Sequence, residues 1–253
     1  EANQEIGDLA LSSDGRLAAV LEGSRRITLF RPSSSKKQDQ RTVELDSDAR
    51  SIGLSDDASI LAVGMKNGEL LLYDIKQSKQ APFRRIVLGV EIASVLFTPD
   101  GRALLLRGAT VGKDSRALAI IDTSKLHEVR YLPMPEALTG ALTSLTISRD
   151  GKLLAAPDAG GNVLLWDLEE RKSVGTSFFD SSPISALALD PTGNAIAAIS
   201  VGDNIVKLAI SPNDMIKRVC DLAGRDLDER EWADLETGLA YSPTCIAAAA
   251  SAP

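Results

Sequence analysis

The chain has 253 residues, 44% of them hydrophobic, and carries 28 Lys and Arg against 35 Asp and Glu, a formal net charge of −7. This content allows one all-β domain with a large core, and the acidic balance disfavours nucleic acid, which binds basic patches. No apolar run approaches the roughly 18 residues of a membrane span, and the opening residues EANQEIGDL do not form a signal peptide. We therefore expect a cytoplasmic protein with no nucleic-acid or membrane partner.

A unit of three short apolar runs joined by two turns occurs five times. The copies start near Ile6, Ser51, Ser94, Leu142 and Ala186. The clearest, 142–168, reads LTSLTISRDGKLLAAPDAGGNVLLWDL and has its turns at Asp150–Gly151 and Gly160–Gly161. Alternating and short apolar runs between turns predict β-strands. Each unit therefore supplies three strands.

The spacing of the copies is regular. The first turn of each copy carries Gly15, Ala58, Gly101, Gly151 and Gly193, at steps of 43, 43, 50 and 42 residues. Another apolar segment follows each of the first four copies, RTVEL, FRRIVL, EVRYL and SVGTSFF, and none follows the fifth. A period of about 40–45 residues with four short strands is typical of a β-propeller blade. Residues 1–211 are thus predicted to form four-stranded antiparallel propeller blades.

A large apolar residue marks the third strand of each copy. Fifteen residues after the turn position stand Phe30, Tyr73, Trp166 and Leu208. Ile121 follows its turn at twenty, because the turn GATVGKDSR is longer. We expect these side chains to be buried at equivalent places between neighbouring sheets.

The pattern becomes helical from Pro212 onward. Met215, Ile216, Val219 and Leu222 share one helix face, and Gly224 can end the helix. A second short helix is indicated by Asp228 as N-cap with Glu231 three residues later. We expect two helices over 213–236, in a C-terminal segment 212–253 that packs on the propeller through Ile216, Val219 and Trp232.

The blade pattern resembles the WD-repeat (tryptophan–aspartate) propellers, on Trp166–Asp167 and its relatives Tyr73–Asp74 and Ile121–Asp122. The Gly-His dipeptide of that family is absent, so its histidine hydrogen-bond network is not carried over. The closing stretch RVCDLAGRDLDEREWADLETGLAYSPTC resembles the end of WD-repeat regions in bacterial multidomain signalling proteins, beside an effector or STAND-class nucleotide-binding domain. The resemblance implies five blades of a larger, seven-bladed ring; a compact five-bladed ring is the alternative.

The same resemblance implies a non-enzymatic module that binds proteins or senses ligands, with a protein partner or an attached effector or nucleotide-binding domain. No cofactor or metal is predicted. The alternative is a propeller enzyme, a hydrolase or lactonase with its site in the central channel. Such a site needs converging polar ligands, whereas the inner strands carry apolar residues at equivalent positions, namely Leu9, Ile52, Val95, Leu145 and Leu187.

In the resembled family, partners often dock on the face made by the turns between second and third strands and by the connections that enter each first strand. The candidate partner-binding residues in these turns are Arg25, Arg26, Lys66, Asn67, Lys113, Arg116, Asn162 and Asp203. A basic rim on an acidic protein would attract an acidic partner. The other interpretation is that these turns are polar because they are solvated.

Three other features have structural interpretations. His127 is the only histidine, so we expect a surface residue rather than a metal ligand. The carboxylates of Asp226, Asp228, Glu229 and Glu231 fit a helix N-terminus better than a cation site. Cys220 and Cys245 are expected to be packed thiols, with a disulfide as the alternative.

Overall fold

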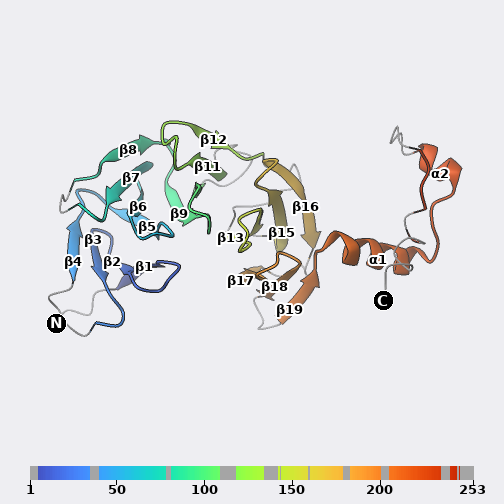
Figure 1. Cartoon of the computed structure of the whole chain (residues 1–253), viewed down its shortest axis with the longest axis horizontal. Helices are drawn as coiled ribbons and strands as arrows, with labels where there is room; N and C mark the ends of the chain where they lie inside the picture. The colour runs from blue at the N-terminus through green and yellow to red at the C-terminus, as the bar shows by residue number, and fades with distance from the viewer. Residues whose placement is uncertain are drawn as a thin grey trace.

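The computed structural model describes residues 5–34, 40–77, 81–108, 118–133, 142, 144–158, 160–178, 183–200, 205–234, 240–243 and 245. Figure 1 shows five small sheets that follow one another along an arc, with the first strand of each sheet on the inner side. The prediction of an all-β propeller with a short helical C-terminal segment is confirmed.

Each sheet is an antiparallel meander in chain order. The first contains β1 (Ile6–Leu11), β2 (Ala18–Glu22), β3 (Arg26–Phe30) and β4 (Arg41–Glu44), and the second β5 (Ala49–Leu54), β6 (Ile60–Met65), β7 (Glu69–Asp74) and β8 (Arg84–Val87). The third contains β9 (Ile92–Phe97), β10 (Ala103–Gly108), β11 (Leu118–Asp122) and β12 (Val129–Tyr131). The fourth contains β13 (Thr146–Ile147), β14 (Leu153–Pro157), β15 (Asn162–Asp167) and β16 (Lys172–Phe178). The fifth has three strands, β17 (Ile184–Leu189), β18 (Ala195–Ser200) and β19 (Ile205–Ala209).

The turns between first and second strands repeat one hydrogen-bond pattern. In the first four sheets, a Ser or Thr hydroxyl donates to the Asp two residues later, as from Ser148 to Asp150 at 2.5 Å. The residue after that Asp has positive φ, which glycine adopts most readily. Ala58 holds this place in the second sheet with φ of 51°. The weaker copy therefore makes the same turn.

The marker residues of the third strands occupy one register. Trp166 pairs with Leu154, and Tyr73 pairs with Leu61. In each sheet the partner on the second strand stands three residues after the turn position. Trp166 and Tyr73 are buried, as predicted, whereas Phe30 and Leu208 are only half-buried. Phe30 is less covered because this position faces the preceding sheet, and the first sheet has no preceding neighbour among the described residues.

The sheets pack face to face through four apolar clusters. Each cluster joins two successive sheets, from the first pair, around Ile27 and Tyr73, to the last pair, around Val163 and Ile196. A closed ring of five sheets would need five such interfaces. Among the described residues no cluster joins the fifth sheet to the first, and Figure 1 shows an open arc. The compact five-bladed alternative is therefore not what the structure shows.

The C-terminal segment contains α1 (Pro212–Ala223) and α2 (Glu229–Asp234). Ser211 caps α1, and Gly224 ends it with φ of 70°. The expected capping box is present, because Glu231 N–H donates to Asp228 Oδ1 and Asp228 N–H donates to Glu231 Oε2, both at 2.9 Å. Neither helix is long and apolar enough to cross a membrane, within the part of the chain that the structure describes.

The disulfide and the aromatic pair of this segment join its own residues. A disulfide joins Cys220 to Cys245, so the interpretation as packed thiols was wrong. The chain after α2 returns to α1, which brings the two Cα atoms within 5.4 Å, a separation that a disulfide spans. Trp232 and Tyr241 meet edge to face at 6.1 Å. Figure 1 shows α1 leading away from the sheets, so the packing of this segment on the propeller stays a prediction.

Candidate functional site

Two of the predicted cations converge on one carboxylate. Arg25, in the β2–β3 turn, donates from Nε to Asp48 Oδ1 at 2.7 Å, and Lys66, in the β6–β7 turn, places Nζ 3.6 Å from Asp48 Oδ2. Ser24 Oγ donates to the same Asp48 Oδ1 at 3.1 Å. We call Ser24, Arg25, Asp48 and Lys66 the Asp48 cluster. It joins the first sheet to the second on one face of the arc.

The backbone fixes the geometry of the Asp48 cluster. Lys66 N–H donates to the carbonyl of Asp48 at 2.9 Å, and Ala49 N–H donates to that of Ser24 at 2.7 Å. The hydrogen bond from Arg25, and then that from Ser24, hold the pKa of Asp48 below its usual value. Asp48 is therefore ionised at neutral pH, and the cluster carries one net positive charge. The side chains of Arg25 and Lys66 remain 63% and 45% exposed.

The other described candidates have partners within their own sheets. Arg26 Nε donates to Glu44 Oε1 at 2.8 Å across the β3–β4 pair. Asn67 donates to Glu69 Oε2 at 2.9 Å, and Arg85 donates to the same oxygen at 2.7 Å.

The remaining candidates do not extend this charged surface. Asn162 donates to the buried carboxylate of Asp158 at 2.9 Å, so it stabilises its own turn. Lys113, Arg116 and Asp203 lie outside the described residues. Of the candidates that the structure describes, only Arg25 and Lys66 are thus brought together from different sheets.

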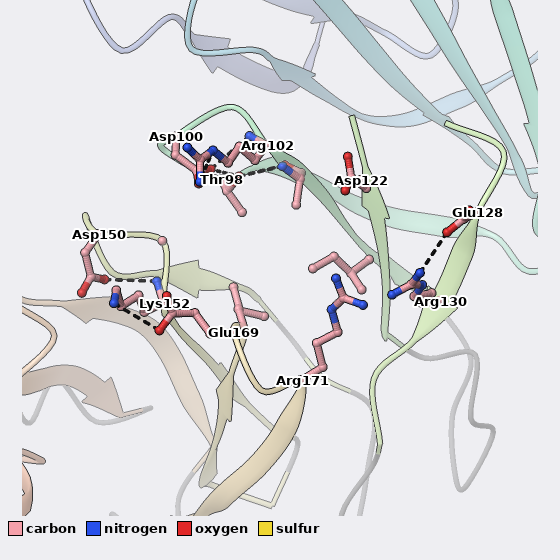
Figure 2. A pocket seen from close by; sticks show the side chains of 14 residues that line it. Thr98, Asp100, Arg102, Asp122, Glu128, Arg130, Asp150, Lys152, Glu169 and Arg171 are labelled. Atoms are coloured by element: carbon pink, nitrogen blue, oxygen red, sulfur yellow. Dashed lines mark hydrogen bonds and ion pairs between the residues drawn. The ribbon is translucent and has the colours of Figure 1, made fainter. Parts of the chain in front are cut away.

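A pocket of about 370 Å³ lies on the opposite face, between the third and fourth sheets (Figure 2). Five carboxylates and four cations line it, above the apolar side chains of Ile120 and Leu168. Lys152 Nζ lies 3.1 Å from Glu169 Oε2, and Arg130 donates to Glu128 at 2.9 Å. This mixture of charges suits a polar side chain of a partner rather than an ion of one sign.

Sequence reasoning missed this pocket. Arg171, which Figure 2 shows reaching into it, sits in the β15–β16 turn with φ of 56°. Positive φ is uncommon for a non-glycine residue. The only sequence signal was the charged stretch Glu169–Lys172 after the Trp166–Asp167 pair. That stretch does not reveal that Glu128 and Arg130, some forty residues earlier, face it.

The inner strands form the wall of the arc's centre. A shallow pocket of about 370 Å³ there is lined by β1, β5 and β9 and includes Asp8. The carboxylate of Asp8 accepts hydrogen bonds from the backbone N–H groups of Leu9 and Ile52, each with an N–O distance of 2.8 Å, so it links two inner strands. No group of three His, Cys, Asp or Glu that could hold a metal occurs among the described residues. His127 is 71% exposed, as expected.

The successive four-stranded meanders, packed face to face on an arc, define a WD-repeat-like β-propeller. Within this class, the chain belongs to the family described as "Domain of unknown function (DUF7165)", whose model matches residues 7–139.

Two curated proteins show similarity in sequence. THO complex subunit 3 of Arabidopsis thaliana is 24% identical over 184 residues, which are 73% of this chain and 55% of that protein. U3 small nucleolar RNA-associated protein 12 of Saccharomyces cerevisiae is 28% identical over 187 residues, 72% of this chain and 18% of that protein. The chain therefore spans about half of the first relative and less than a fifth of the second.

Solved structures show similarity in fold. The β-propeller domain of Cps50 (Swd1) from Myceliophteria thermophila superimposes with a TM-score of 0.66 at 14% identity, covering 84% of this chain and 67% of that one. Hydrazine synthase of Kuenenia stuttgartiensis gives a TM-score of 0.65 at 15% identity, covering 83% and 68%. At such identities the likeness concerns the fold alone.

Proposed function

We propose that this propeller is a non-enzymatic protein-interaction module, and that it binds an acidic partner through the face carrying the Asp48 cluster. One observation carries the proposal: Arg25 and Lys66, from two different sheets, share one carboxylate and leave exposed positive charge on an acidic chain. The fold supports it, and so does the similarity to a protein named as a subunit of the THO complex.

In the Asp48 cluster, Arg25 and Lys66 can release the carboxylate of Asp48 and bind a carboxylate of a partner instead. Arg25 presents a planar fork that binds carboxylates in two-point geometry, and Lys66 adds a mobile point charge. Because both are exposed, the internal ion pairs cost little to replace. Such rim charges mainly raise the association rate and the specificity, and salt weakens their effect.

The setting of this module is part of the proposal. The resemblance of the C-terminal segment to bacterial signalling proteins supports a regulatory propeller in a larger cytoplasmic protein, attached to an effector or nucleotide-binding domain. An enzymatic role is the weaker candidate. Its support is that hydrazine synthase, an enzyme by name, shares the fold, and that Asp8 lines the central pocket. The backbone N–H groups bound by Asp8 favour a structural role.

A charge-reversal experiment tests the binding face. The probe is a labelled decapeptide of alternating Glu and Gly, and its affinity for the full chain is measured at ~20 mM and ~150 mM salt. We expect the double variant Arg25→Glu, Lys66→Glu to weaken binding about tenfold at low salt, on the basis that two exposed charge contacts contribute about 1.4 kcal/mol together.

The matched control reverses two charges in the same sheets on the opposite face, as Arg16→Glu, Lys76→Glu. Their side chains are 87% and 70% exposed, and each lies near one Asp, as Arg25 does. Equal losses in the two double variants would show a general charge effect and refute this binding face. Unchanged binding in the first variant would refute it as well.

A further inference from the structure

The pocket between the third and fourth sheets differs from its counterpart one interface earlier. That counterpart also has a volume of about 370 Å³ and is lined by the corresponding turns of the second and third sheets. Among the described residues, its lining holds Asp56, Asp57 and Asp100 but no Lys or Arg. The pocket between the third and fourth sheets holds both signs of charge. The cations therefore belong to this interface and not to the repeat in general.

Most cations of this pocket already have a carboxylate beside them. The three pairs are Arg130 with Glu128, at 2.9 Å, Lys152 with Glu169, at 3.1 Å, and Arg102 with Asp100, at 3.8 Å. The fourth cation, Arg171, makes no hydrogen bond or ion pair with any residue that the structure describes. Its guanidinium is thus available to bind a ligand.

The backbone of Arg171 is held in a conformation that suits glycine. Its φ of 56° lies in the left-handed region, where a side chain costs free energy. Of the described non-glycine residues only Ala58 shares a positive φ, and Ala58 stands at a turn position that glycine holds in the other sheets. Figure 2 shows Arg171 reaching from the fourth sheet toward the third, where Asp122 and Arg130 lie. This conformation therefore directs the guanidinium across the pocket.

Asp122 lines the pocket from the third sheet, at the end of β11. The N–H and the hydroxyl of Ser124 both donate to Oδ1 of Asp122, at 2.8 and 2.6 Å. The hydroxyl, and then the N–H, hold the pKa of Asp122 below its usual value, so this carboxylate is ionised at neutral pH. No described group donates to Oδ2. This oxygen is thus available to a cationic group of a ligand.

We propose that this pocket binds a free α-amino acid with an aliphatic side chain, whose carboxylate pairs with Arg171 and whose ammonium pairs with Asp122. A guanidinium binds a carboxylate through two parallel N–H groups. The floor of the pocket contains Ile120 and Leu168, which offer an apolar contact to the side chain of the amino acid. The volume of about 370 Å³ is typical of a small-molecule site.

The charges of the pocket disfavour simpler occupants. A free anion meets five carboxylates, and a free cation meets the unpaired guanidinium of Arg171, so like charges repel either ion. A charged side chain of a partner matches Arg171 or Asp122 but leaves the other charge unmatched. The two charges of an α-amino acid match both residues and leave the net charge of the site unchanged.

The probe is L-leucine, titrated into the full chain and followed by two-dimensional 15N NMR, which detects weak binding and locates it. We expect saturable shifts in the amides of Gly101, Lys152 and Arg171. The dissociation constant should be ~1–10 mM, because the charges of this open site stay partly solvated. N-acetyl-L-leucine lacks the ammonium group, and L-leucinamide lacks the carboxylate. Each should bind about fivefold more weakly at equal ionic strength, as expected for the loss of one exposed ion pair.

The decisive variant is Arg171→Gly, which removes the guanidinium and suits the positive φ, so the turn is retained. We expect it to weaken L-leucine binding about fivefold and to leave the urea midpoint of the chain no lower. The matched control is Arg149→Gly, at an exposed arginine of the β13–β14 turn that does not line the pocket. This control should bind L-leucine with little change.

The variant Asp122→Asn tests the other end of the ligand. Asparagine keeps the oxygen that accepts from Ser124 but removes the charge that the ammonium needs. It should weaken the binding of L-leucine about fivefold and leave the binding of N-acetyl-L-leucine unchanged or stronger.

Three results would overturn the proposal. The first is no saturable shift in the turns of the pocket up to ~50 mM L-leucine, well above the expected dissociation constant. The second is equal binding by the Arg171→Gly and Arg149→Gly variants. The third is binding of N-acetyl-L-leucine or L-leucinamide as tight as that of L-leucine, because one charge would then suffice and a side chain of a partner would be the better occupant.

Discussion

The substitution Trp166→Ala probes the packing between the third and fourth sheets. The indole is fully buried, in the cluster that contains Leu105, Leu118 and Leu154. Its Nε1 donates to the carbonyl of Pro133 at 2.8 Å. Pro133 is exposed, so water can replace that hydrogen bond when the indole is removed. The cavity left by the ring therefore dominates the cost.

The magnitude follows from these two contributions. Removing a buried Trp costs about 3–5 kcal/mol in unfolding free energy, whereas a hydrogen bond that water can replace contributes about 1 kcal/mol or less. Trp166→Phe keeps most of the ring contacts and loses the hydrogen bond, so we expect a cost of about 1–2 kcal/mol. The two substitutions together separate packing from hydrogen bonding.

Urea unfolding followed by far-ultraviolet circular dichroism measures both costs. With a slope of about 3 kcal/mol per molar urea, Trp166→Ala should lower the midpoint by about 1–1.7 M. Val87→Ala, at a residue that is 69% exposed on β8, should stay within about 0.5 kcal/mol of the unmodified chain. The reasoning fails if Trp166→Ala costs less than about 1 kcal/mol, or if Trp166→Phe costs as much as Trp166→Ala.

The repeat was predictable from the sequence because the period and the alternation are local. The turn position fixes the register, so Trp166 and Tyr73 fall opposite Leu154 and Leu61 without any knowledge of other sheets. Even Ala58, which breaks the glycine pattern, keeps the turn conformation. The exposure of a repeated position was less predictable. It depends on the neighbouring sheet, as the difference between buried Leu70 and exposed Ile205 shows.

The candidate site was only partly predictable, because its partners are distant in sequence. The turn residues Arg25 and Lys66 were identified, but Asp48 was not, since it lies in the β4–β5 connection, 23 residues after Arg25. The pairing of Cys220 with Cys245 likewise depends on the path of the chain after α2. The small number of cysteines in a large chain favoured free thiols, but the fold brings the two cysteines close enough to form a disulfide.

Two further predictions concern acid and reduction. Hydrogen bonds from Ser59 and then Ser55 lower the pKa of Asp57 from 3.8 to about 2. Because the pKa of Asp57 is lower in the folded chain, its ionised carboxylate stabilises the fold at pH values above about 4, and this contribution disappears as the pH falls from about 4 to about 2. Because Asp57 is 62% exposed, we expect a contribution of only about 1 kcal/mol after screening by solvent. Asp57→Asn should therefore lower the unfolding free energy at pH 7 and change it little at pH 2. A loss of unfolding free energy that is the same at both pH values would contradict the assignment to the ionised carboxylate. The disulfide closes a loop of 25 residues, for which chain entropy gives about 3.5 kcal/mol. Because the disulfide joins two residues of the C-terminal segment, dithiothreitol or Cys245→Ser should make α1 and α2 sensitive to protease and leave amide exchange in the sheets unchanged. If reduction instead speeds exchange in β18 and β19 to the same extent, the prediction that the disulfide stabilises the C-terminal segment alone is refuted, and the predicted packing of this segment on the propeller is supported.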